Sequence, residues 1–187
     1  LQTLELYRKS TIVGTYLSLT RILAIFVSVF LPVIWLLAAT NQELLPEYLH
    51  FIGTKEVGNI GLGIQFIVAS LGIDLIRMAS IQVPGSLATS LSLIGALILG
   101  DFAVKVGLFS PEVILYMAIA AIGNFAIPGY ELALVLKLIR FIFLISAIIG
   151  NIWGFVVVLI LVLLWMGFTK TFGVYYLWPI IPFNYQA

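Results

Sequence analysis

The feature that most constrains this chain is a series of long apolar runs in which charged side chains are rare. A helix needs about 20 mostly apolar residues to cross the hydrocarbon layer of a membrane. Hydrophobic residues make up 63% of the 187 positions and charged residues only 9%. Because a domain of this size cannot bury so much apolar surface, the solvent around it must be lipid. We therefore expect an all-α integral membrane protein.

Six apolar runs are candidates for membrane-crossing helices. They cover residues 22–39, 57–76, 87–108, 113–127, 131–149 and 152–168. Gly150 and Asn151 are the expected turn between the last two runs. The second run is interrupted by glycines, so it can cross, re-enter on the same side or lie in the interface. The expected architecture is a polytopic helical bundle with about five to six transmembrane helices. The placement of the second run stays open, because it can cross the membrane, re-enter or lie in the interface.

Basic residues predict the orientation of the bundle. Arg8, Lys9 and Arg21 precede the first run, and basic residues favour the cytoplasmic side of a membrane. The loop at 41–56 has three acidic residues and one lysine, which suits the outside. Six crossings would return the chain to the inside at Lys170, although a hairpin that dips without crossing would place the ends equally well.

The remaining composition argues against several classes of function. A net charge of +1 without clustered lysine and arginine does not predict a nucleic-acid surface. The chain has no cysteine, and His50 is its single histidine, so neither a metal site nor a histidine-based catalytic centre is expected. No catalytic triad or ligand cluster is visible, and we expect neither an enzyme nor a cofactor.

Charged residues inside an apolar run are the strongest functional signal. Asp101 and Lys105 lie four residues apart in the third run, so they share a helix face and can pair. Placing such a charge near the bilayer centre costs about 2.5–3.5 kcal/mol, so it usually faces a bundle interior, a partner charge or water. At about 100° per residue, one stripe of this helix has polar ends and an apolar middle. The stripe contains Ser86, Ser90, Ile94, Leu97, Asp101 and Lys105.

The stripe has two interpretations. It can line a pore whose hydrophobic gate is formed by Ile94 and Leu97, since charged rings and apolar constrictions are the usual parts of channels. Alternatively, the charges neutralise each other near the membrane edge, while Ser90 and Gly95 serve close helix packing.

A second group of charges is expected to form intramembrane ion pairs. Lys137 and Arg140 are three residues apart and share a face of the fifth run. Together with Glu131, they are expected to pair across the bundle with Asp74 or Asp101. A structural ion pair is the favoured interpretation, and conformational coupling is the alternative. The full expected set is Asp74, Arg77, Glu131, Lys137 and Arg140.

Several stretches, in order along the chain, resemble the membrane part of the GerA family of spore germination A subunits. Residues 44–46 (LLP) resemble the family's "ELLP" loop, and residues 74–84 (DLIRMASIQVP) resemble its "ELLREAGIRLP" element. Residues 94–101 (IGALILGD) with Ser110 and Pro111 resemble "IVGALVIGQAAVxAGLVSP".

The later stretches continue the resemblance. Residues 125–130 (FAIPGY) resemble "FAIPSY", and Arg140-Phe141 resembles the "RLLRF" that follows it. Residues 171–177 (TFGVYYL) resemble "SFGVPYL".

Other positions indicate a branch of the family. The stretch GDFAV at 100–104 and the ending YLWPIIPF at 176–183 are most similar to the stage V sporulation branch. Met78 and Tyr175 stand where receptor-type members have Glu and Pro, which also favours that branch.

The resemblance implies a multi-pass protein of the inner spore membrane in a spore-forming Firmicute. Residues 1–187 would then be a single transmembrane domain, a fragment without the family's cytosolic N-terminal domain. The family is similar to homo-oligomeric channels, expected to be pentamers, that release monovalent cations during germination. The implied partners are other spore germination membrane proteins, besides the lipid bilayer.

Three hypotheses for function follow. The first is an oligomeric ion channel with its pore lined by the helix at 87–108. The second is a component of a secondary transporter, a class that often contains broken helices. The third is a non-conducting membrane scaffold for a signalling domain, in which the intramembrane charges are purely structural.

Overall fold

The computed structural model describes residues 11–47, 53, 59–83, 85–127, 129–168, 170–171 and 174–175. This part of the chain is almost entirely helical, and the expected all-α membrane bundle is confirmed. The helices are α2 (Thr11–Thr40), the short η1 (Gln42–Leu44), α3 (Leu62–Gln82), α4 (Gly85–Leu97), η3 (Ile98–Phe102), α5 (Ala103–Lys105), α6 (Pro111–Phe125) and α7 (Tyr130–Phe168). Two-residue strands β1 (Lys170–Thr171) and β2 (Val174–Tyr175) pair antiparallel after α7.

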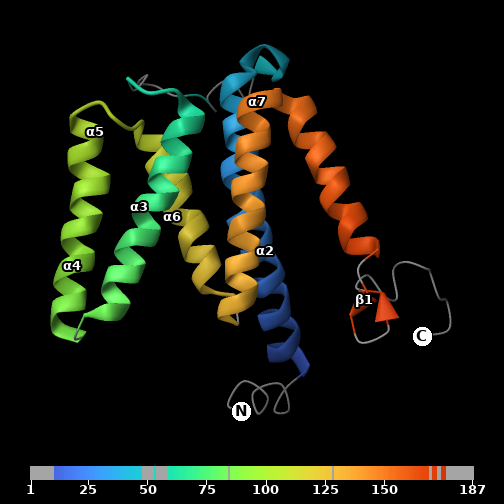
Figure 1. Cartoon of the computed structure of the whole chain (residues 1–187), viewed down its shortest axis with the longest axis horizontal. Coiled ribbons are helices and arrows are strands. Elements are labelled where there is room, and N and C mark those ends of the chain that lie inside the picture. The colour runs from blue at the N-terminus through green and yellow to red at the C-terminus, as the bar shows by residue number, and fades with distance from the viewer. Residues whose placement is uncertain are drawn as a thin grey trace.

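The long helices run alternately up and down the bundle (Figure 1). Among the described residues, four helices are long and apolar enough to cross a membrane, and the shorter apolar α6 packs among them. The segments α4, η3 and α5 follow one another without a break and form one pass. The start of α2 and the end of α7 lie on the same side of the bundle (Figure 1).

The helix α7 is broken at the expected turn. Asn151 has φ 51° and ψ −140°, and it is the one described residue other than glycine with a positive φ. The 39 residues of α7 would extend about 58 Å as a straight helix, roughly twice the ~30 Å hydrocarbon layer. The side-chain amides of Asn151 and Asn41 exchange two hydrogen bonds of 2.6 Å, which tie the break to the end of α2. The break therefore divides α7 into two passes, 130–150 and 152–168.

The second apolar run forms one regular helix, which extends from Leu62 to Gln82 instead of the predicted 57–76. The expected run ended at 76, but α3 continues to Gln82 because no helix-breaking residue precedes Pro84. No turn interrupts α3, and it has the length and composition of a crossing helix. Likewise, α2 begins at Thr11 rather than near 22, since no breaker separates its polar start from its apolar body.

The core lies where α2, α3, α6 and the first half of α7 meet. One face of α6 is fully buried through Val113, Met117 and Ala120. By contrast, α4 lies at the edge of the bundle and packs mainly on α3. A Cβ added at Gly72 or Gly95 would stand within 3 Å of a side chain on the facing helix, so these glycines allow the close approach of α3 and α4.

The backbones of α6 and α2 approach each other closely at Gly123. A Cβ at Gly123 would lie 2.9 Å from the backbone oxygen of Ala24 and 3.4 Å from Ser28. Because a backbone atom cannot turn aside as a flexible side chain can, the two helices would have to separate.

We predict that Gly123→Ala lowers the stability of the full-length protein by about 1–3 kcal/mol, a typical cost of overpacking. The measurement is the thermal unfolding midpoint of the purified protein in detergent. Gly100→Ala is the matched control, because nothing lies within 4 Å of its added Cβ. An equal loss in both variants would show that the contact between α6 and α2 is not responsible.

Candidate functional site

The stripe predicted on α4, η3 and α5 points away from the rest of the bundle. The helix packs on its neighbours through partly or fully buried residues, namely Ala88, Ser92, Gly95, Leu99 and Ala103. The predicted stripe is offset from this packing face by two residues, which is about 200° around a helix. Its described side chains are all exposed, namely Ser90, Ile94, Leu97, Asp101 and Lys105. The side chain of Ser86 lies outside the described part of the structure.

Asp101 and Lys105 pair with each other on this exposed face. Their carboxylate and ammonium groups are 2.7 Å apart, and the side chains are 52% and 67% exposed. Asp101 is therefore not the partner of the charges on α7. Lys105 is the last residue of α5, so the pair lies at one end of this pass, where it can reach water at the membrane edge or face another protein chain.

The helix contains a π turn at η3, which begins directly after Leu97 and contains Asp101. A π turn holds one more residue than an α turn, so it rotates Asp101 and Lys105 around the axis relative to Ile94. A wheel drawn at a constant angle cannot include this rotation. Such turns occur frequently at functional sites.

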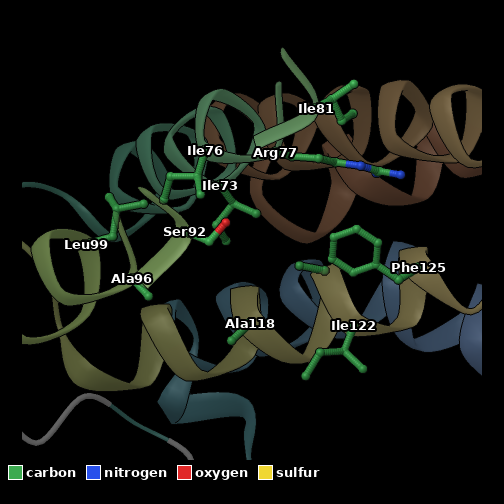
Figure 2. A pocket seen from close by; sticks show the side chains of 11 residues that line it. Ile73, Ile76, Arg77, Ile81, Ser92, Ala96, Leu99, Ala118, Ile122 and Phe125 are labelled. Carbon is green, nitrogen blue, oxygen red and sulfur yellow. The ribbon is translucent and has the colours of Figure 1, made fainter. Parts of the chain in front are cut away.

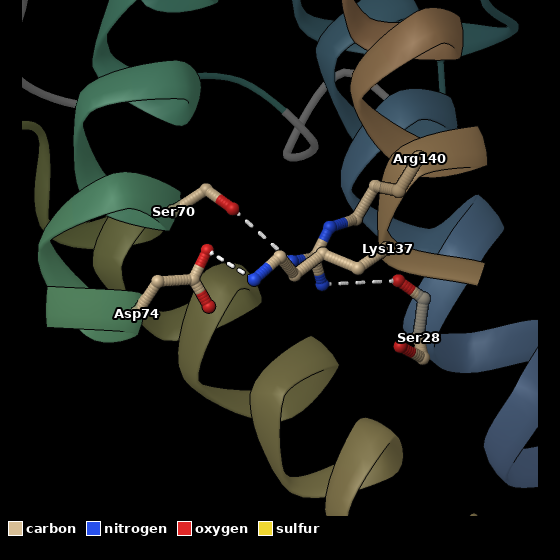
Figure 3. A network of polar contacts seen from close by, with 5 residues as sticks. All are labelled: Ser28, Ser70, Asp74, Lys137 and Arg140. Carbon is tan, nitrogen blue, oxygen red and sulfur yellow. Dashed lines mark hydrogen bonds and ion pairs between the residues drawn. The ribbon is translucent and has the colours of Figure 1, made fainter. Parts of the chain in front are cut away.

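A second polar cluster joins three helices inside the bundle (Figure 3). Asp74 on α3 and Lys137 on α7 form an ion pair of 2.9 Å, and each side chain is 20% exposed. Arg140, one turn further along α7, is 3% exposed. Its guanidinium donates hydrogen bonds to the hydroxyl of Ser70 on α3 at 3.1 Å and to the backbone oxygen of Ser28 on α2 at 3.3 Å.

Pro32 explains why Arg140 can bond to the backbone of α2. In a regular helix, the oxygen of Ser28 would accept a hydrogen bond from the N–H of the residue at position 32. Proline has no N–H, so this oxygen loses its helical partner. Pro32 and Ser28 are both buried, and water cannot replace the missing donor there. The guanidinium of Arg140 supplies it instead.

The other two charges of the expected set have different surroundings. The guanidinium of Arg77 lies over the ring of Phe125 at 4.6 Å and near the ring of Tyr130 at 5.8 Å. No carboxylate of the described residues is within ion-pair distance of Arg77. Glu131 is exposed in the first turn of α7, where a negative charge favours the helix dipole, and it joins no ion pair in the described chain.

Several buried polar residues were not identified from the sequence. Ser28 and Ser70 accept hydrogen bonds from Arg140. Gln65 on α3 accepts a hydrogen bond from the backbone N–H of Ser110 at 2.8 Å, which ties α3 to the start of α6. Asn124 on α6 is also buried. The available signal was a polar side chain inside an apolar run, and at Ser28 a proline four residues later.

The comparisons with known proteins agree on one family. The sequence model of the family described as "Bacillus/Clostridium GerA spore germination protein" matches residues 1–187. Stage V sporulation protein AF of Bacillus subtilis (strain 168) is 42% identical over 187 residues, which cover all of this chain and 38% of that protein. Spore germination protein KA of the same organism is 28% identical over 189 residues, covering all of this chain and 35% of that protein.

A third relative in that organism, the membrane protein YfkQ, is 27% identical over 98% of this chain and 36% of its own length. The chain therefore spans somewhat over a third of the length of these curated relatives. No solved structure matches the chain.

We predict that Pro32 and Arg140 are energetically coupled. Arg140→Met should lower the unfolding midpoint of the full-length protein, because it leaves the oxygen of Ser28 without a donor. In a Pro32→Ala background, the restored N–H at position 32 bonds to that oxygen, so the same change should cost less. A double-mutant cycle of thermal unfolding measures the coupling, expected at about 0.5–3 kcal/mol for residues that share a partner. Additive losses would contradict the shared contact.

We also predict that the two ion pairs differ in their effect on stability. Asp74→Asn should lower the unfolding midpoint, because it leaves Lys137 unpaired beside the buried Arg140. Asp101→Asn should leave the midpoint nearly unchanged, since an exposed pair contributes only about 0–1 kcal/mol. Exchange of the partners in Asp74→Lys/Lys137→Asp should recover part of the loss. Equal effects at Asp74 and Asp101 would contradict the assignment.

Proposed function

This chain belongs to the GerA family of spore germination proteins, and we propose that it forms the membrane part of an oligomeric channel that releases monovalent cations during germination. The relatives are named as germination, sporulation and membrane proteins, and none of the three named above is named as an enzyme. We place the protein in the inner spore membrane, with other germination membrane proteins as its partners.

The observation that carries the proposal is the orientation of α4 and α5. Their charged stripe lies opposite the face that packs on α3, so the described part of the bundle leaves it uncovered. A single copy in lipid would expose Asp101 and Lys105 to hydrocarbon or force them to the membrane edge. Several copies around a symmetry axis would instead turn the stripe toward a shared aqueous centre. A homo-oligomer, for which we propose five copies, removes the cost of the exposed pair.

In such an oligomer, each part of the stripe has a role. Ile94 and Leu97, about half exposed in one copy, would form rings that constrict the pore and exclude water when closed. Asp101 would form a ring of carboxylates that attracts cations at one mouth. Lys105 would partly neutralise that ring. The π turn begins after Leu97 and contains Asp101, so it would allow the charged ring to rotate relative to the apolar one.

The buried cluster supports a static frame behind this helix. Arg140, Asp74 and Lys137 join α2, α3 and α7, whereas α4 lies at the edge of the bundle and packs mainly on α3. Movement of α4 and α5 against that frame would therefore open or close the pore with little cost to the core.

We predict that Ile94→Ala combined with Leu97→Ala raises ion leak through the reconstituted full-length protein, because smaller side chains widen the proposed constriction. Ion flux from proteoliposomes is the measurement. Leu115→Ala on α6 is the control, since Leu115 is 56% exposed and Ile94 53%, but Leu115 is outside the stripe. No flux in any variant would favour the non-conducting scaffold, and saturable uptake of one solute would favour a transporter.

A second prediction concerns the proposed carboxylate ring. Asp101→Asn should lower the permeability of cations relative to anions, and Lys105→Gln should raise it, because the two charges oppose each other at one mouth. Reversal potentials in planar bilayers under a salt gradient measure the ratio. Unchanged ratios in both variants would place the pair outside the ion path.

A further inference from the structure

An apolar groove runs between α3, α4 and α6, and none of the residues proposed to line the pore contributes to it (Figure 2). Its volume is about 670 Å³, within the roughly 300–1,000 Å³ of typical ligand sites. It is open on one side rather than enclosed. Nearly all of its lining is aliphatic or aromatic, and the polar exceptions are Arg77 and Ser92. Such a groove in a membrane bundle suits a hydrocarbon chain.

One end of the groove carries a positive charge. Figure 2 shows Arg77 and Phe125 together at one end, with Ala96 and Leu99 toward the other. The Arg77 guanidinium rests on the rings of Phe125 and Tyr130, but no described carboxylate reaches it. The charge therefore has attractive contacts and room for an anion.

A small polar pocket adjoins this end. Its volume is about 90 Å³, and Arg77 and Ile81 line both spaces. Asp74, Asn124 and Lys137 also line the small pocket. Asn124 is 6% exposed, and its side-chain oxygen has no hydrogen-bond partner in the described structure. That buried oxygen is an unused hydrogen-bond acceptor in the wall of the small pocket.

The polar end of the groove lies near the edge of the hydrocarbon layer. Arg77 is five residues from the end of α3, or about 7.5 Å along the helix. Phe125 ends α6 and Tyr130 begins α7, so both rings are at helix ends on the same side of the bundle (Figure 1). Aromatic side chains gather at the level of the lipid headgroups. This is also the side where α2 begins and Arg21 predicts the cytosol.

We propose that this groove binds an anionic phospholipid, with an acyl chain between α3, α4 and α6 and the phosphate on Arg77. A hydroxyl-bearing headgroup, as in phosphatidylglycerol, would donate a hydrogen bond to Asn124. The charge balance favours an anion, because Arg77, Lys137 and Arg140 stand against Asp74 alone in the adjoining cluster. Basic pockets between helices on the cytoplasmic side are known to bind anionic headgroups.

The bound lipid would also support the outermost helix. Ser92, Ala96 and Leu99 of α4 and η3 line the groove, and the opposite wall is α6. An acyl chain would fill the gap between α4 and α6 and hold α4 in its position on α3. The proposal stands independently of conduction, because it concerns the face of α4 opposite the stripe.

The test uses the full-length protein, delipidated in detergent and then titrated with phosphatidylglycerol or with phosphatidylcholine of the same acyl chains. Native mass spectrometry counts retained lipids, and thermal unfolding gives the stability gained. We expect phosphatidylglycerol to bind more tightly and to raise the unfolding midpoint more. Arg77→Gln should weaken its binding by about five- to tenfold, while Arg77→Lys retains part of the preference.

Three further variants separate the contribution of the groove from that of the Arg77 charge. Ala118→Trp should fill the groove and reduce retention of both lipids with Arg77 intact, and the milder Ala121→Met serves if the first variant does not fold. Lys105→Gln removes a cation that does not line the groove and should change nothing in lipid binding.

Equal binding of the two lipids, or Arg77→Gln without effect, would overturn the proposal. Loss of the oligomer in Ala118→Trp without retained lipid in the wild type would show instead that a second copy of the chain occupies the groove.

Discussion

The bundle depends on one buried guanidinium. Arg140 reaches from α7 to the hydroxyl of Ser70 on α3 and to the oxygen of Ser28 on α2. That oxygen is available because Pro32 has no N–H to offer it. In hydrocarbon every polar backbone group must find its partner within the protein, so the proline and the arginine require each other. The contact fixes both the rotation and the depth of α7 relative to α2 and α3.

The frame held by Arg140 contrasts with the helix at its edge. The core side chains of α6 are fully buried, whereas most side chains of α4 are exposed. Two faces of α4 then acquire different environments. The packing face borders α3 and the apolar groove, and the opposite face continues through η3 and α5, where it carries Asp101 and Lys105. The pass formed by α4, η3 and α5 thus has an apolar groove behind it and a charged pair in front of it.

The stretches that resemble the GerA family contain much of this chemistry. Asp74 and Arg77 lie in the segment 74–84, and Phe125 and Tyr130 lie in 125–130. The fold brings these two segments together, so that Arg77 rests on both rings. Short motifs distant in sequence thus meet at one end of the bundle, beside the groove and the polar cluster. Local sequence patterns alone do not reveal that meeting.

The sequence by itself determined the lipid environment, the helical class and the break at Asn151, because apolar length and helix-breaking residues act locally. It also indicated which charges would need partners. Only the tertiary structure decided the partners. Lys137 pairs with Asp74 and not with Asp101, and the guanidinium of Arg77 contacts two aromatic rings. Partner choice depends on how far each helix is rotated and raised against its neighbours. Those rotations are set by close contacts, such as that of Gly123 with α2, and by the π turn in η3. Neither feature can be predicted from the periodicity of the sequence.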